Sequence, residues 1–269
     1  MTDPSHSFRS LRVEAIVLRH SDYGEADRLL TLYTREQGKV RAVAKGARKI
    51  ASRKAGHIEP FTHVKLQLAK GRDLLIVTQA ETINVFMQLR DNLTLTGYAA
   101  YAIELLDRFV PDEETANPSL FRLLTETLSR LAENPYPWLA VRFYEMRLLD
   151  FLGFRPQLFD CANCENEIKA EDQYFSPSLG GAICPRCGQG LPALWPISVD
   201  ALKYLRHFQR SSFREASRAN PDEQTQKEIE SVMQGYFTYL LERELNTPGF
   251  IKRVASSSPN STQTPTPQK

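Results

Sequence analysis

The chain has 269 residues, of which 42% are hydrophobic and 25% are charged, a composition typical of a soluble globular protein with more than one core. The longest apolar stretch, residues 93–110, is interrupted by Glu104, Asp107 and Arg108, so no membrane-spanning helix is expected. Because no apolar signal segment lies near Met1, we expect a cytoplasmic protein.

The formal net charge of +2 conceals a gradient along the chain. Residues 1–80 carry 15 Lys and Arg against 8 Asp and Glu, whereas residues 81–160 carry 7 against 12. The last part of the chain, residues 161–269, is balanced. A basic first third followed by an acidic middle indicates that the first third contacts a polyanion.

Residues 11–90 show the short alternating apolar patterns of β-strands, separated by turns that contain glycine. Val64, Leu66 and Leu68, for example, share one face of a strand. Five such strands in about eighty residues favour a small closed barrel of the OB type, with an open antiparallel sheet as the alternative. The predicted strands are residues 13–18, 28–34, 39–44, 63–69 and 74–78.

A run of seven cations without one acid begins in the third strand, between residues 39 and 54. On an OB-type barrel such a run favours a nucleic-acid site, because cations neutralise successive phosphates. A solvated basic loop is the plainer interpretation. Tyr23, Tyr33 and Phe61 are candidate stacking residues. The predicted nucleic-acid-binding residues are Lys39, Arg41, Lys45, Arg48, Lys49, Arg53 and Lys54.

Two other patterns near the barrel point to catalysis only weakly. Asp22, Glu25 and Asp27 are close in sequence and form a conceivable metal cluster, although solvated turn residues explain them more simply. His57-Ile58-Glu59 matches half of a zinc-deaminase signature, but no Pro-Cys-x-x-Cys follows it. The chain also lacks a phosphate-binding P-loop.

After Asp91 the apolar period becomes helical. Asn117-Pro118 and the run 220–223 have the residue types that open helices, and Gly153 is suited to a helix end. The predicted helices are residues 93–110, 118–131, 138–152, 198–219 and 223–245. The final residues are Ser, Thr, Pro, Asn and Gln with almost no apolar side chain, which predicts a disordered tail.

The chain's four cysteines form two C-x-x-C pairs with nineteen residues between them. This spacing predicts one tetrahedral thiolate site for zinc, made by Cys161, Cys164, Cys184 and Cys187. A disulfide scaffold belongs to small secreted domains, and a redox pair needs a βαβ setting that is absent here. Because a four-cysteine site leaves no open ligand position, the zinc is expected to be structural.

A second group of cations recurs at steps of three, four, four and four within the predicted helix 198–219, so that they share one face of it. An ordinary solvated face is the alternative to a site for an acidic peptide or a phosphate backbone. These residues are Lys203, Arg206, Arg210, Arg214 and Arg218.

We therefore predict an α+β, multidomain fold: an N-terminal OB-type β-barrel, then an all-helical domain with an inserted four-cysteine zinc module. The expected division is an N-terminal extension (1–10), the barrel (11–90), the helical domain (91–253) with its zinc module (159–190), and the tail (254–269).

Several segments of the first third resemble, in order and spacing, the RecO family of bacterial DNA repair proteins. They are residues 14–18, 23–30, 34–39, 44–49, 52–53 and 78–81. Many members of that family also carry a four-cysteine module within a helical domain, so the resemblance covers about residues 11–253.

The resemblance implies a recombination mediator without enzymatic activity, associated with the nucleoid. It implies binding of single- and double-stranded DNA through the barrel, annealing of complementary strands and contact with the acidic C-terminal tail of the single-strand-binding protein SSB, for which Lys203 to Arg218 are candidates. It also implies cooperation with RecR in loading RecA. Two alternatives are a metal-dependent nucleic-acid enzyme and a zinc-stabilised adaptor that does not contact DNA.

Overall fold

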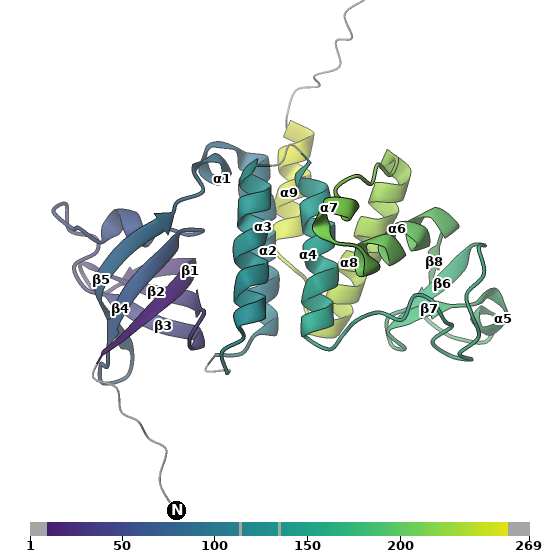
Figure 1. Ribbon diagram of the computed structural model, residues 1–269, viewed down its shortest axis with the longest axis horizontal. Helices are drawn as coiled ribbons and strands as arrows, with labels where there is room; N and C mark the ends of the chain where they lie inside the picture. The colour runs from purple at the N-terminus through teal and green to yellow at the C-terminus, as the bar shows by residue number, and fades with distance from the viewer. Residues whose placement is uncertain (1–9, 113–114, 134–135, 258–269) are drawn as a thin grey trace, which may run out of the picture.

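The computed structural model describes residues 10–112, 115–133 and 136–257, and Figure 1 shows a β-barrel at one end, helices in the middle and a small sheet at the other end. In that part of the chain, no helix is both long enough and apolar enough to cross a membrane. The expected α+β fold with an OB-type barrel is confirmed.

The barrel closes in the strand order β1-β2-β3-β5-β4, so the alternative of an open sheet is wrong. Every pairing is antiparallel except the short parallel contact between β3 and β5, which pairs Ala42 with Leu75 and Val43 with Ile76. The strands are β1 Ser10–Tyr23, β2 Asp27–Thr34, β3 Gly38–Ala44, β4 His63–Ala69 and β5 Leu75–Asn84.

The alternation that predicted the strands fills the barrel. Leu30, Leu32, Val64, Leu66 and Leu68 are buried inside it, and burying each such side chain stabilises the fold by about 1.5–3 kcal/mol. β1 runs five residues beyond its predicted end, since its polar end pairs with β2 through backbone hydrogen bonds and carries no hydrophobic signal.

The outer face of β1 and β2 packs against the helices. Ile16, Leu18 and Tyr33 belong to the same core as the helical residues, and the ring of Tyr33 stacks on Phe121 at 6.5 Å between centroids. Barrel and helices therefore share one hydrophobic interface.

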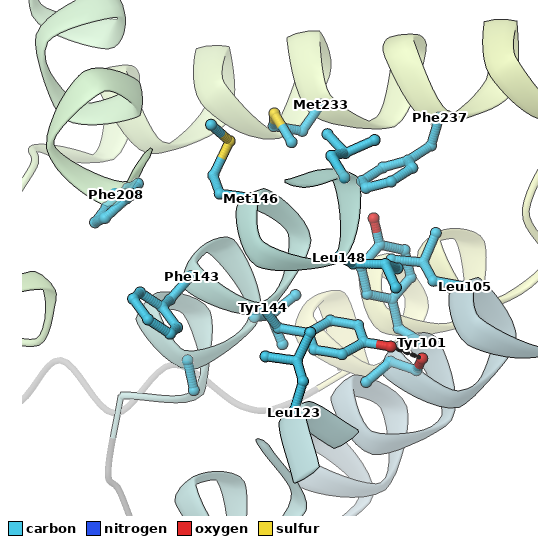
Figure 2. Close-up of a cluster of buried hydrophobic side chains, with 14 of the residues drawn as sticks. Tyr101, Leu105, Leu123, Phe143, Tyr144, Met146, Leu148, Phe208, Met233 and Phe237 are labelled. Atoms are coloured by element: carbon cyan, nitrogen blue, oxygen red, sulfur yellow. Dashed lines mark hydrogen bonds between the residues drawn. The ribbon is translucent and has the colours of Figure 1, made fainter. Parts of the chain in front are cut away.

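The helical part is built around α4, as Figure 2 shows: its Phe143, Tyr144, Met146 and Leu148 lie among side chains of the neighbouring helices. Tyr144 also donates a hydrogen bond to the carbonyl oxygen of Ala102, 2.8 Å away. The helices are α1 Met87–Asp91, α2 Leu93–Phe109, α3 Pro118–Glu133, α4 Pro137–Phe151, α6 Val199–Arg210, α7 Phe213–Ala216, α8 Glu223–Leu241 and α9 Thr247–Ser257.

Predicted helix ends are set by local side chains. The side chain of Asn117 accepts hydrogen bonds from the N–H groups of Ser119 and Leu120, and that of Asp222 accepts one from Thr225. Gly153, just beyond α4, has φ +80°, which favours glycine after a helix.

The predicted helix 198–219 is two helices, α6 and α7, because the chain breaks at Ser211 and Ser212, both in extended conformation. Ser212 starts α7 through a capping box with Glu215, so its hydroxyl favours a new helix over the continuation of α6. The helix predicted to reach residue 245 ends at Leu241, followed by Glu242 with φ +53°.

Helix α9 was not predicted, and the tail expected from residue 254 is partly wrong because α9 continues to Ser257. Glu104 of α2 accepts hydrogen bonds from the N–H groups of Asn246 and Thr247 and from the Thr247 hydroxyl, which caps α9. A Cβ at Gly97 would lie 3.0 Å from Ile251, so this glycine permits the close approach of α9. Residues 258–269 and the extension 1–9 lie outside the described residues.

Candidate nucleic-acid interface and metal centre

The basic segment continues from β3 into a loop at the end of the barrel farthest from the helices (Figure 1). Ala47 and Ile58 are buried in the barrel core and fix both ends of this loop, and the short η1 helix, Ala55–His57, lies near its end. Gly46, with φ +66°, donates its N–H to the carboxylate of Asp27 at 2.7 Å. Both ends of the loop are thus attached to the barrel.

Two carboxylates, those of Asp22 and Asp27, and the backbone of Glu25 contact this loop. Asp22 forms an ion pair with Arg48 at 3.2 Å, and Arg48 also donates to the backbone carbonyl of Glu25. Within the described part of the chain, no His, Cys, Asp or Glu group other than the four cysteines has three ligand atoms close enough for one metal ion. A catalytic metal cluster at Asp22, Glu25 and Asp27 is therefore wrong.

Four of the seven predicted cations point to solvent. Arg41, Lys45, Lys49 and Arg53 are exposed, and none forms an ion pair with the residues that the structure describes. Their charges are uncompensated and available to an anion.

Lys54 and Arg48 are partly engaged. The Lys54 ammonium donates to the carbonyl oxygen of Val77 at 3.1 Å, and Arg48 has the acidic partner Asp22. These two cations help to position the loop.

Lys39 does not project toward a ligand, which corrects the sequence-based assignment. Its side chain is 8% exposed and its ammonium lies 2.9 Å from the Asp107 carboxylate, with the carbonyl oxygens of Asp107 and Val110 also accepting from it. Position 39 faces the helices because residues alternate along β3, and the inward set is Val40, Ala42 and Ala44. Lys39 therefore joins the barrel to α2.

Lys70 and Arg72 also lie on this side of the barrel, although their sequence pattern predicts only a turn. Both are exposed, and together with Arg41 they line a cavity of about 460 Å³ beside β3. A Cβ at Gly71 would lie 2.1 Å from the carbonyl oxygen of Leu74, so the tight turn between β4 and β5 requires glycine. Loops at this position of OB barrels commonly contact oligonucleotides.

The three aromatic candidates for base stacking differ in how far their side chains are buried. Tyr33 is 1% exposed and lies in the interface with α3, and Phe61 is half-buried against the same core. Tyr23, at 46% exposure, is the member of this set with a free ring surface.

The partial deaminase match is a structural element of the barrel. His57 contacts the Thr82 hydroxyl, whereas Glu59 pairs with Arg28 and His20. Burial raises the pKa of Glu59, but the hydrogen bonds from Arg28 and His20 outweigh it and lower the pKa overall.

The four cysteines come together as predicted. Their sulfur atoms all lie within 4.8 Å of one another, and the Cys164 and Cys184 sulfurs are 3.9 Å apart. Each pair lies on a hydrogen-bonded turn: the N–H of Glu165 donates to the carbonyl of Cys161, and that of Gly188 to the carbonyl of Cys184. Four thiolates at this spacing fit a tetrahedral structural metal such as zinc.

Backbone donors favour the thiolate form at Cys161 and Cys164, whereas burial raises the pKa of Cys184 to about 11. The backbone N–H of Asn166 lowers the pKa of Cys164 to about 6, and the N–H of Cys184 donates to the Cys161 sulfur. Because thiolate is the form that binds metal, these donors assist ligation.

The metal centre is attached to the helices through a three-stranded sheet of order β7-β6-β8. Phe175 of β6 stacks on Trp195 and contacts Tyr236 of α8. The elements are β6 Gln173–Ser176, β7 Gly181–Ile183, β8 Trp195–Ile197 and the short α5 Pro185–Gly188.

The five cations from residue 203 to 218 do not share one helical face, because α6 ends at Arg210. Arg206 donates to the carbonyl oxygens of Leu158 and Ile168, and Arg210 lies 3.3 Å from the ring centre of Phe159. These two residues connect α6 to the chain around the first cysteine pair, here called the cysteine segment (residues 158–190).

Lys203 and Arg218 instead line an open cavity of about 520 Å³ with Tyr204, His207 and Glu215. Arg214 lies on α7 and is exposed. The predicted set is thus divided: Arg206 and Arg210 make a structural contact, Lys203 and Arg218 line the cavity, and Arg214 does neither.

Comparisons with known proteins agree with this architecture. A family model described as "Recombination protein O N terminal" matches residues 8–86, and one described as "Recombination protein O C terminal" matches residues 90–248.

Similar curated proteins carry the name DNA repair protein RecO. That of Roseiflexus is 44% identical over 246 residues, which cover 91% of this chain and 86% of the relative. That of Dehalococcoides mccartyi is 37% identical over 244 residues, 91% and 94% of the two chains. That of Pelotomaculum thermopropionicum is 35% identical over 246 residues, 91% and 95%.

Proposed function

The chain belongs to the RecO family, which supports a role in DNA repair, and from this membership we propose that it is a non-enzymatic recombination mediator. It binds single- and double-stranded DNA through the barrel, anneals complementary strands and acts in the cytoplasm at the nucleoid. It acts with RecR to load RecA on DNA coated by SSB.

The observation that carries this proposal is the set of uncompensated cations on the barrel. Arg41, Lys45, Lys49 and Arg53 are exposed on β3 and the following loop, and Lys70 and Arg72 join Arg41 at the cavity. A loop that displays cations without ion-pair partners among the described residues suits a phosphate backbone. Tyr23 supplies a ring on which one base stacks.

The experiment is a salt titration of binding to single-stranded DNA of unrelated sequences. The affinity falls steeply and to the same extent for each sequence, because released counterions set the slope. Binding that is insensitive to salt would contradict the proposal. An annealing assay with complementary oligonucleotides, with heat-denatured protein as control, tests the second activity.

The acidic tail of SSB binds at the cavity between α6 and α7. Lys203 and Arg218 supply the charge for carboxylates, and Tyr204 and His207 supply flat side chains for apolar residues of a peptide. Arg206 and Arg210 are not assigned to this cavity, because they contact the cysteine segment.

Zinc at the four cysteines stabilises the cysteine segment without taking part in chemistry. Bound zinc holds the two turns together, and the sheet transmits this rigidity to α8 through Phe175 and Tyr236.

A further inference from the structure

A fully exposed isoleucine stands at the tip of the basic loop. The side chain of Ile50 is 107% exposed, although the two other apolar residues that anchor the loop, Ala47 and Ile58, are buried. Other apolar side chains of this loop are therefore buried in the barrel core, whereas that of Ile50 is in solvent. Among the residues that the structure describes, none covers the Ile50 side chain.

The backbone around Ile50 is held in position. The N–H of Lys49 donates to the carbonyl of Gly46, and the N–H of Ser52 donates to that of Lys49, so Ile50 lies within a turn. The N–H of Arg48 donates to Ala26, which ties the turn to the β1–β2 connection. The tip is thus a fixed projection.

Cations surround this projection. Lys45, Lys49 and Arg53 are exposed on the same loop, and the exposed Tyr23 lies at the end of β1, next to the Asp22 that holds Arg48. An apolar tip between phosphate-binding cations is the arrangement by which proteins insert an aliphatic side chain between bases while the backbone is held by charge.

We propose that Ile50 is an apolar wedge that enters the base stack of DNA bound to the loop and unstacks one step. This inference rests on the proposed function, since the cations must first bring DNA to the loop. Its ligand is DNA with a weakened step, such as a mismatch or a strand end, where unstacking costs least. A wedge at that step assists the exchange of pairing partners.

The test uses the full-length protein and short duplexes that carry 2-aminopurine beside one mismatch, with a fully matched duplex for comparison. Wild type increases the 2-aminopurine fluorescence of the mismatched duplex. Ile50→Ala abolishes most of this increase and weakens binding to that duplex by about five- to tenfold, at the lower end of the range for the loss of one base contact. The salt slope of binding stays unchanged because no phosphate contact is removed.

Two variants serve as controls. Ile50→Met keeps an apolar tip and retains the fluorescence increase, and Leu179→Ala removes an exposed apolar side chain from the β6–β7 turn without effect. Equal melting temperatures of wild type and Ile50→Ala establish that the fold is intact.

The proposal for Ile50 is wrong if wild type binds DNA with a steep salt slope but Ile50→Ala gives the same fluorescence increase as wild type. The proposed function fails separately, if wild type does not bind DNA. Loss of binding to phosphatidylglycerol vesicles in Ile50→Ala, with unchanged fluorescence, would also overturn the wedge and assign the tip to a membrane surface.

Discussion

The ammonium group of Lys39 lies 2.9 Å from the carboxylate of Asp107, sixty-eight residues further along the chain. This ion pair, in which the Lys39 side chain is buried and Asp107 is 20% exposed, connects β3 of the barrel to the C-terminal end of α2. A cation that the sequence places among phosphate-binding residues is thus a link between the two main parts of the fold.

Lys39→Ala is expected to destabilise the protein by about 2 kcal/mol, because the carbonyl oxygens of Asp107 and Val110 lose their donor. The Asp107 carboxylate keeps its ion pair with Arg19 at 3.2 Å. The salt dependence of DNA binding is expected to stay the same. Urea unfolding and a DNA titration measure the two quantities. Arg41→Ala is the control: this residue is exposed on the same strand, so its replacement is expected to flatten the salt slope and leave the stability unchanged. A flattened salt slope in Lys39→Ala would show that Lys39 contacts DNA.

Replacing Lys45, Lys49 and Arg53 together with alanine is expected to reduce the slope of log affinity against log salt by about 2 for single-stranded DNA, at about 0.7 for each phosphate contact. The melting temperature stays near that of wild type, since these side chains have no partners within the described structure. Replacing Arg122, Lys227 and Lys252, exposed cations far from the barrel loop, is the matched control. If the loop substitutions leave the salt slope unchanged, the main DNA site lies outside this loop.

Cys161→Ser together with Cys164→Ser is expected to abolish binding of one zinc ion per chain and to lower the melting temperature. DNA affinity is expected to stay close to that of wild type under conditions in which the variant is still folded, because the loop of the barrel is remote from the metal centre (Figure 1). Elemental analysis and differential scanning fluorimetry check this, with Lys169→Ala in the same segment as control. Wild type purified without metal would refute the assignment.

Substitutions in the basic set from residue 203 to 218 are expected to affect peptide binding at Lys203 and Arg218, and protein stability at Arg206. Lys203→Glu with Arg218→Glu abolishes binding of a fluorescent SSB tail peptide and leaves the melting temperature unchanged, because both residues line the open cavity. Arg206→Ala lowers the free energy of unfolding by about 2 kcal/mol, because the carbonyl oxygens of Leu158 and Ile168 lose their donor. Wild-type peptide binding by the double variant would disprove the cavity assignment.

Glu145 is expected to make stability depend on pH. Burial raises the pKa of its carboxyl to about 7, although the Arg142 guanidinium, 2.9 Å away, opposes this shift. The folded protein holds the proton up to about pH 7, whereas the unfolded chain releases it near pH 4.5, so stability falls as pH rises between these values. Wild type therefore loses stability relative to Glu145→Gln between about pH 5 and 7. A difference that is constant with pH would show that Glu145 stays ionised beside Arg142.

The sequence determined the features that depend on neighbours along the chain. Alternation in segments such as residues 63–69 predicted the barrel strands, Asn117-Pro118 predicted the start of α3, and two C-x-x-C pairs predicted one four-sulfur site. Each signal is local, because pleating, capping and turn geometry act within a few residues.

Only the tertiary structure decided where the charges go. Lys39, Arg41 and Lys45 look alike in the sequence, yet Lys39 is buried against α2 while the other two reach solvent. Arg206 was assigned to a solvent-facing set and instead bonds to carbonyl oxygens more than thirty residues away. A long cationic side chain binds whichever oxygen atoms packing brings near it, and the closed barrel and the docked cysteine segment fix those oxygen atoms in space.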